Sequence, residues 1–200
     1  MTDQSRQQKI QQFNEFFSIK KDFSINIKVL PKDATPLSYE AFLAAMPLPF
    51  KMATDISSID HSALRALQGL SQVASQLVDF LNLQSQKIDM LVSYILSQQQ
   101  DQTTHYDGIE FGGGGIIFTS AQTMTCDTFI ELKIFILSAN CALFCIGEII
   151  EIEHTEQGYQ HKVIFHHIRE EDREILVRTS LHEQAKQLQA LAKQRNPKPQ

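Results

Sequence analysis

A heptad pattern of apolar residues runs through residues 60–100, and it constrains the fold more than any other feature of the chain. Its a and d residues alternate at spacings of four and three, which is the pattern of a coiled coil. The seam includes Leu67, Leu70, Leu77, Leu81, Gln84, Ile88, Leu91 and Ile95. A helix of about 40 residues is about 60 Å long, which is longer than a small domain is wide. We therefore predict an obligate homo-oligomer that assembles through this helix.

The positions beside this seam are also largely apolar. Val78 and Val92 occupy e positions, and Phe80 occupies a g position, where a two-stranded coil usually carries charges. Either several helices therefore associate, with a tetramer favoured over a dimer, or the helix also packs on its own domain. A helix folded back entirely on its own chain is the alternative. Gln84, a polar residue at a central d position, is expected to specify the register of the helices.

Composition argues against several function classes. The net charge of −5 provides no electrostatic attraction for nucleic acid or for an anionic membrane. No apolar run approaches the ~18 residues of a membrane span, and the polar N-terminus does not resemble a secretory signal. The odd number of cysteines, Cys126, Cys141 and Cys145, predicts reduced thiols in a reducing compartment. These features predict a cytoplasmic protein without a membrane span.

The chain divides into three predicted segments. Residues 1–59 hold a short helix, a strand at Phe23–Val29 in which apolar residues alternate, and a second short helix. Residues 60–100 form the long heptad helix. Residues 107–195 contain short strands separated by turn residues and then a C-terminal helix, which is typical of a small antiparallel barrel. The predicted fold class is therefore α+β.

Four consecutive glycines, Gly112–Gly115, stand between two predicted strands. A phosphate-binding loop would need a following helix and a lysine, and the sequence has neither at this place. A glycine run within strand sequence marks either a close approach to the backbone, for which a ligand is one candidate, or a tight hairpin. Of these two interpretations, we favour the hairpin.

The segment Glu110-Phe-Gly-Gly-Gly-Gly-Ile-Ile-Phe118 resembles the signature segment of PilZ domains. Residues 145–153 and 163–176 are similar to the later strands and the closing helix of that family, so the resemblance covers residues 107–190. It implies a small β-barrel, and many PilZ domains are receptors for the bacterial messenger cyclic di-GMP. A long heptad helix beside the barrel resembles an atypical subclass of the family that forms tetramers.

The resemblance also implies positions for ligand contacts. The family's Asp/Asn-x-Ser-x-x-Gly pattern places Glu110 at the Asp/Asn position, Gly112 at the Ser position and Gly115 at the final glycine. Glu110 is one methylene longer than Asp, and Gly112 has no side chain. The family's Arg-x-x-x-Arg pair, which clamps phosphates just before the barrel, has no counterpart in residues 98–106.

An Arg-x-x-x-Arg pair does occur later in the chain, at Arg169 and Arg173, and these two residues are further candidate ligand contacts. The three residues that follow Arg169, Glu170–Asp172, are all acidic. Guanidinium groups beside carboxylates favour ion pairs within one helix. We therefore expect these arginines on a solvated helix face.

Residues of catalytic type form no recognisable motif in this sequence. His166 and His167 are predicted to point to opposite faces of a strand, so that they do not share a metal ion. We predict a non-enzymatic protein without a metal or cofactor: an oligomeric PilZ-like adaptor in cyclic di-GMP-related or motility-related signalling. It is expected to lack the usual nucleotide-binding residues and to contact an unidentified signalling or motility protein. The alternative is a true cyclic di-GMP receptor that uses non-standard residues.

Overall fold

The computed structural model describes residues 3–31, 38–52, 72–136, 141–156 and 158–195. Leu67 and Leu70 of the predicted seam lie outside these residues. The elements are, in chain order, α1 (Asp3–Glu15), β1 (Ser18–Val29), α2 (Tyr39–Ala45), α4 (Gln72–Ser97), η1 (Gln102–Thr104), β2 (His105–Gly112), β3 (Gly115–Ser120), β4 (Phe129–Ile136), β5 (Cys141–Thr155), β6 (Gly158–His167) and α5 (Glu170–Arg195).

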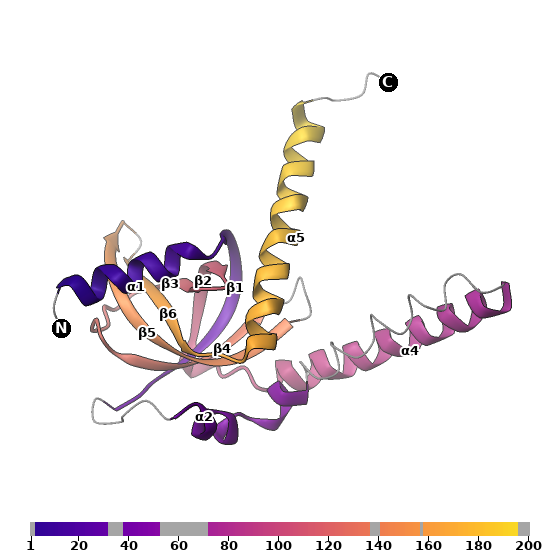
Figure 1. Cartoon of the computed structure of the whole chain (residues 1–200), viewed down its shortest axis with the longest axis horizontal. Coiled ribbons are helices and arrows are strands. Elements are labelled where there is room, and N and C mark those ends of the chain that lie inside the picture. Colours follow the sequence, from indigo (N-terminus) through magenta and orange to yellow (C-terminus); the bar gives the residue numbers. More distant parts are fainter. Residues whose placement is uncertain (1–2, 32–37, 53–71, 137–140, 157, 196–200) are drawn as a thin grey trace.

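Six strands of the described chain form a closed barrel in the order β1-β2-β3-β6-β5-β4 (Figure 1). Every neighbouring pair is antiparallel. Closure pairs the backbone groups that an open sheet would leave at its edges. The α+β class, the antiparallel barrel and the C-terminal helix are confirmed.

The barrel begins earlier in the chain than expected. β1 lies between β2 and β4, and Ile25 stands opposite Tyr106 on one side and Ile134 on the other. We expected the barrel to be confined to residues 107–195. This boundary is corrected, because β1, a strand from residues 1–59, is part of the barrel. The alternation of apolar residues predicts that strand, but such a pattern does not specify a pairing partner beyond the long helix.

Alternate residues of the strands fill the barrel interior. Ile25, Phe118 and Leu132 are completely buried there. Burial of each such side chain stabilises the fold by about 1.5–3 kcal/mol. Because side chains alternate between the faces of a strand, the intervening residues point outward. These outward residues carry the contacts with the helices and line the pocket described below.

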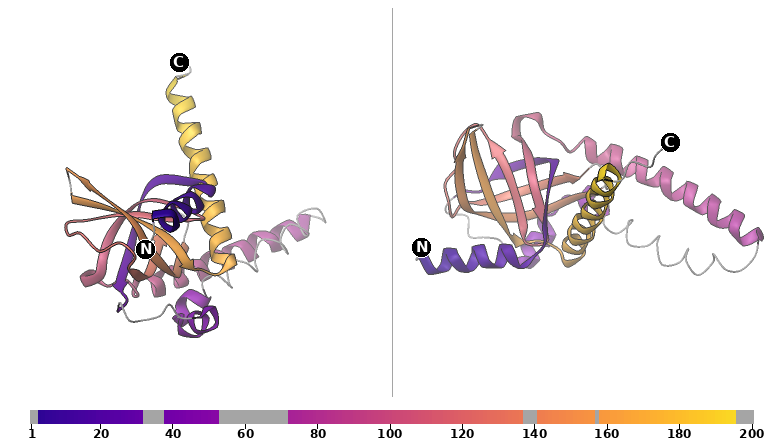
Figure 2. Two further views of the ribbon diagram at one scale, coloured as in Figure 1. Left: turned by 60° about the vertical axis from the view of Figure 1, so that its left-hand side comes forward. Right: turned by 90° about the horizontal axis from the view of Figure 1, so that it is seen from above.

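The helices lie outside the barrel (Figures 1 and 2). α1 crosses the outside of β5 and β6, and the first part of α5 lies against β1 and β2. A second apolar cluster, which contains Phe42 of α2, Leu96 of α4 and Phe144 of β5, fixes α2 and the C-terminal end of α4 to the barrel. The rest of α4 and the C-terminal part of α5 project as two separate arms (Figure 1).

The helix predicted for residues 60–100 is present from Gln72 to Ser97 in the described residues. Val92 and Leu96, at e and b positions, contact the second apolar cluster. The helix therefore does pack on its own domain at its C-terminal end. It does not fold back entirely on its own chain, because Leu91 is 64% exposed. No helix of the described residues is long and apolar enough to cross a membrane.

Candidate functional site

The glycine run forms the hairpin between β2 and β3, as favoured from the sequence. The chain's own backbone makes the close approaches that require glycine here. A Cβ atom on Gly112 would lie 2.3 Å from the carbonyl oxygen of Phe17, and one on Gly115 would lie 2.0 Å from that of Val163. Two neighbouring segments therefore pack directly against the backbone of the hairpin.

Helix α1 covers the surface next to this hairpin. Phe13 is 4% exposed and packs in a small cluster with Ile150. Arg6 donates from Nε to the carbonyl oxygen of Ile150 at 2.8 Å, and Lys9 pairs with Glu148 at 2.5 Å. One buried aromatic ring and two polar contacts thus attach α1 to the barrel.

The positions matched to the ligand motif already have partners within the chain. Glu110 accepts a hydrogen bond from Ser18 Oγ at 2.5 Å. Arg173 donates from Nη1 to the carbonyl oxygen of Gly113 at 2.5 Å. The structure thus brings Arg173 to the hairpin that follows Glu110. Arg169 points elsewhere, because its Nη2 donates to the carbonyl oxygen of Phe50 at 3.1 Å.

Arg169, just before α5, and Arg173, within it, differ in part from the expectation. The expected ion pairs within the helix are confirmed: Arg169 lies 2.8 Å from Asp172, and Arg173 lies 3.7 Å from Glu170. The expected solvated face is wrong, because the side chains of Arg169 and Arg173 are only 12% and 23% exposed. The charge pattern indicates the ion pairs, but it does not show which side of the helix the barrel covers.

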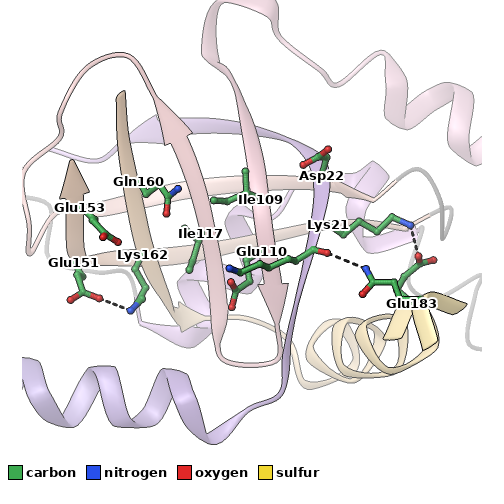
Figure 3. Close-up of a pocket in the computed structure, with 12 residues that line it drawn as sticks. Lys21, Asp22, Ile109, Glu110, Ile117, Glu151, Glu153, Gln160, Lys162 and Glu183 are labelled. Carbon is green, nitrogen blue, oxygen red and sulfur yellow. Dashed lines mark hydrogen bonds and ion pairs between the residues drawn. The ribbon is translucent and has the colours of Figure 1, made fainter. Parts of the chain in front are cut away.

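A pocket of about 760 Å³ opens on the outside of the barrel, beside α5 (Figure 3). It is lined by Lys20, Lys21, Asp22, Ile109, Glu110, Ile117, Glu151, Glu153, Gln160, Lys162, Glu183 and Gln187. Five of these residues are carboxylates and three are lysines. Its size falls within the ~300–1,000 Å³ of ordinary ligand pockets. The charge of its wall suits a cationic group better than a phosphate.

Ion pairs inside the pocket use two of the three lysines. Lys21 pairs with Glu183, and Lys162 pairs with Glu151 (Figure 3). The hydrogen bond from Lys21 is the main cause that lowers the pKa of Glu183, so this carboxylate stays charged at neutral pH. These two lysines therefore neutralise carboxylates of the wall, and Lys20 is the third lysine of the pocket.

Apart from Glu110, sequence reasoning missed the residues of this pocket and the basic residues of α1. Because β1 is the first strand, the segment just before the barrel is α1, which carries Arg6 and Lys9. No simple alternation indicates the pocket residues of β1, because Lys20, Lys21 and Asp22 all line it, next to an irregularity in the pairing between Lys20 and Phe23. The convergence of five strands and α5 on one pocket depends on the topology of the barrel.

The prediction that His166 and His167 point to opposite faces is wrong. Their rings lie 4.3 Å apart. The pairing of β6 with β5 moves from Phe165 opposite Gly147 to His167 opposite Ile146, so His166 is an extra residue in a β-bulge. A bulge interrupts the alternation of side chains. Within the described residues, no group of three or more His, Cys, Asp or Glu side chains has the geometry of a metal site.

The exposed side of α4 is apolar over a wide arc. Its large exposed apolar residues are Leu77, Phe80, Leu83, Ile88, Met90, Leu91, Tyr94 and Ile95. These occupy the heptad positions c, g, d and a, which are adjacent around a helix and span about half of its circumference. The predicted a/d seam thus forms one side of a broader surface, which also includes the g and c positions and which we call the α4 face.

Comparison with known proteins gives matches at the level of structure. No family model and no curated protein matches the sequence. A PilZ domain from Xanthomonas campestris, described as tetrameric and self-assembled through an unusual helical bundle, matches with a TM-score of 0.54 and 14% identity. The match covers 90% of this chain and 96% of that chain. An inhibitor of motility from Bacillus subtilis matches with a TM-score of 0.39 and 12% identity, over 41% of this chain and 42% of that chain. The closed six-stranded barrel with its flanking helices is therefore a PilZ-like fold.

Proposed function

We propose that this protein is a non-enzymatic, oligomeric adaptor that holds several PilZ-like barrels together through α4. The exposed apolar α4 face is the observation that carries the proposal. Phe80, Met90 and Leu91 are 56%, 67% and 64% exposed on a helix that projects from the barrel. Contiguous apolar surface of this kind marks an interaction site.

The width of the α4 face supports four chains rather than two. A two-stranded coil buries only the a and d residues and leaves g positions near water. Here the g residue Phe80 and the c residue Met90 are apolar as well as exposed. A bundle of four helices covers more of each helix than a pair does. The tetrameric assembly described for the Xanthomonas campestris protein agrees with this arrangement.

In this proposal the barrel contacts an unidentified signalling or motility protein in the cytoplasm, and it needs neither cofactor nor metal. The packing of the ligand-motif positions supports a role without nucleotide. Glu110 and Arg173 are engaged with Ser18 and Gly113. The nearby pocket has more carboxylates than lysines, which disfavours an anionic ligand.

Sedimentation velocity tests the proposal. The double variant Leu77→Asp, Leu91→Asp places charges in the centre of the α4 face, and we expect it to sediment as a folded monomer. Asn82→Asp adds a charge at a b position away from that face and should retain the wild-type size. Circular dichroism verifies that each variant is folded. An unchanged size of the double variant would refute assembly through α4.

A cyclic di-GMP receptor is the second candidate, and the position of α1 favours it. Arg6 and Lys9 precede the first barrel strand, where PilZ receptors carry their arginine pair. Both now contact β5, at Ile150 and Glu148, so binding would require them to exchange partners. Isothermal titration with cyclic di-GMP separates the two functions. Binding in the micromolar range that is lost in Arg6→Ala or Arg173→Ala, but not in the exposed control Arg178→Ala, would support the receptor.

A further inference from the structure

The C-terminal part of α5 is a helix without cover from the described chain. Every residue from 185 to 192 is exposed, including Leu188 at 59% and Leu191 at 53%. Gln187 still contacts the barrel, because its Nε2 donates to the carbonyl oxygen of Lys20 at 3.2 Å. We define residues 188–195 as the α5 arm. Exposed leucines on an uncovered helix favour burial, so we expect this arm to have a partner surface.

The charge of this part of the chain identifies the kind of surface that fits. Residues 184–200 carry Lys186, Lys193, Arg195 and Lys198 and contain no aspartate or glutamate. The arm therefore combines two exposed leucines with positive charge. A complementary surface has an apolar floor and a negatively charged rim.

The pocket beside α5 has both properties. Ile109 and Ile117 line it and are half-buried. After the internal pairs Lys21–Glu183 and Lys162–Glu151 are formed, the remaining charged residues of the wall are Lys20, Asp22, Glu110 and Glu153. Three of these four carry negative charge. The pocket thus presents two isoleucines within an acidic surround.

We propose that the α5 arm of one chain docks in this pocket on a second copy of the chain. Leu188 and Leu191 then cover the two isoleucines, and the positive charge of Lys193 and Arg195 neutralises the acidic wall. An arm of eight residues is about 12 Å long and, with side chains, about 10 Å wide, so its leucine-bearing face enters the pocket while the opposite face stays in solvent.

An arm cannot reach the pocket of its own chain. Glu183 and Gln187, at the base of the arm, line that pocket. The helix continues straight from there and leads away from the barrel (Figure 1). The direction of the helix therefore permits the arm to dock in the pocket of another copy and not in its own. The inference rests on the proposed assembly, which holds the copies close to one another and raises the effective concentration of each arm.

Chemical cross-linking of the wild-type protein tests this contact. A carbodiimide joins a lysine to a carboxylate only when they touch. Chains of natural isotopic composition are mixed with chains labelled with heavy nitrogen. Native mass spectrometry first establishes that oligomers containing both kinds of chain have formed. We expect mixed-isotope cross-links between Lys193 and Asp22 or Glu153. Lys186 and Glu183, which lie 3.0 Å apart within one chain, provide the control for links inside a chain.

Two variants make the test sharper. Lys193→Glu should abolish the mixed cross-links of the arm, and adding Glu153→Lys should restore them with the charges reversed. Mixed oligomers whose Lys193 links lead elsewhere, for example to Asp79 of α4, would overturn the docking but leave the assembly through α4 intact. A mass of one chain throughout would instead refute the proposed assembly. Mixed cross-links to Asp22 or Glu153 that persist in Lys193→Glu through Lys186, outside the arm, would also contradict the contact as proposed.

Discussion

Arg173 of α5 donates a hydrogen bond from Nη1 to the carbonyl oxygen of Gly113 at 2.5 Å, and its guanidinium lies 5.2 Å from the centre of the Phe16 ring. One side chain thereby joins the C-terminal helix, the glycine hairpin and the end of α1. Three segments that are distant in sequence thus meet at this side chain on one side of the barrel.

Removal of this side chain should destabilise the fold. A hydrogen bond to a charged group contributes about 1.5–3 kcal/mol, and we expect Arg173→Ala to lower the free energy of unfolding by about 2 kcal/mol. Urea denaturation measures this loss. Arg178→Ala, at an exposed position of the same helix, should change the free energy by less than about 0.5 kcal/mol. Equal stability of the two variants would mean that Arg173 does not hold these segments together.

His161 should make the stability dependent on pH. It is fully buried, stacks on Phe118 with ring centres 4.8 Å apart, and accepts a hydrogen bond at Nε2 from the backbone N–H of Met124 at 3.1 Å. Burial lowers the pKa of His161 from its ordinary value of 6.5. The unfolded chain therefore binds the proton more tightly, and stability falls as the pH drops below about 6.5.

Urea titrations between pH 7.5 and 5 test this dependence. His161→Phe keeps an aromatic ring against Phe118 but removes the acceptor of the Met124 N–H and the titrating group. We therefore expect a lower free energy of unfolding at pH 7.5 and a shallower decline of that free energy toward pH 5. His182→Phe, on the exposed side of α5, should keep the wild-type slope. If His161→Phe declined as steeply as the wild type, another group would be responsible for the pH dependence.

Phe13 should account for most of the attachment of α1. Truncation of a buried phenylalanine to alanine costs about 3–5 kcal/mol. Because Phe13 lies near the end of one helix rather than inside the barrel, we expect Phe13→Ala to release α1 before the barrel unfolds. Hydrogen exchange should then become faster in residues 3–15 and stay slow in β4. Gln12→Ala, at an exposed position, is the matched control, and uniform loss of protection would contradict this order.

The sequence predicts the elements of this fold better than their arrangement. Alternation in Phe23–Val29 predicts β1, and heptad spacing predicts α4, because both periods are local properties of the chain. The membership of β1 in the barrel and the burial of Arg169 depend on contacts between distant segments, which no local pattern encodes. The bulge at His166 is also invisible, since one extra residue leaves the composition of the strand unchanged.

Gln84 should control the specificity of the assembly more than its strength. It is a half-buried polar residue within the α4 face. A polar residue at such a position fixes register and oligomeric state but costs stability. We expect Gln84→Leu to raise the melting temperature and to produce a mixture of oligomers, which native mass spectrometry resolves. A single oligomer of unchanged size would show that Gln84 does not specify the register.

The mass of the wild-type protein in solution tests the central claim most directly. Sedimentation equilibrium at micromolar concentration and physiological salt gives this mass without reference to shape. Assembly through the α4 face predicts four times the mass of the 22.8 kDa chain, unchanged on dilution across the micromolar range. A mass of one chain under these conditions would contradict the account.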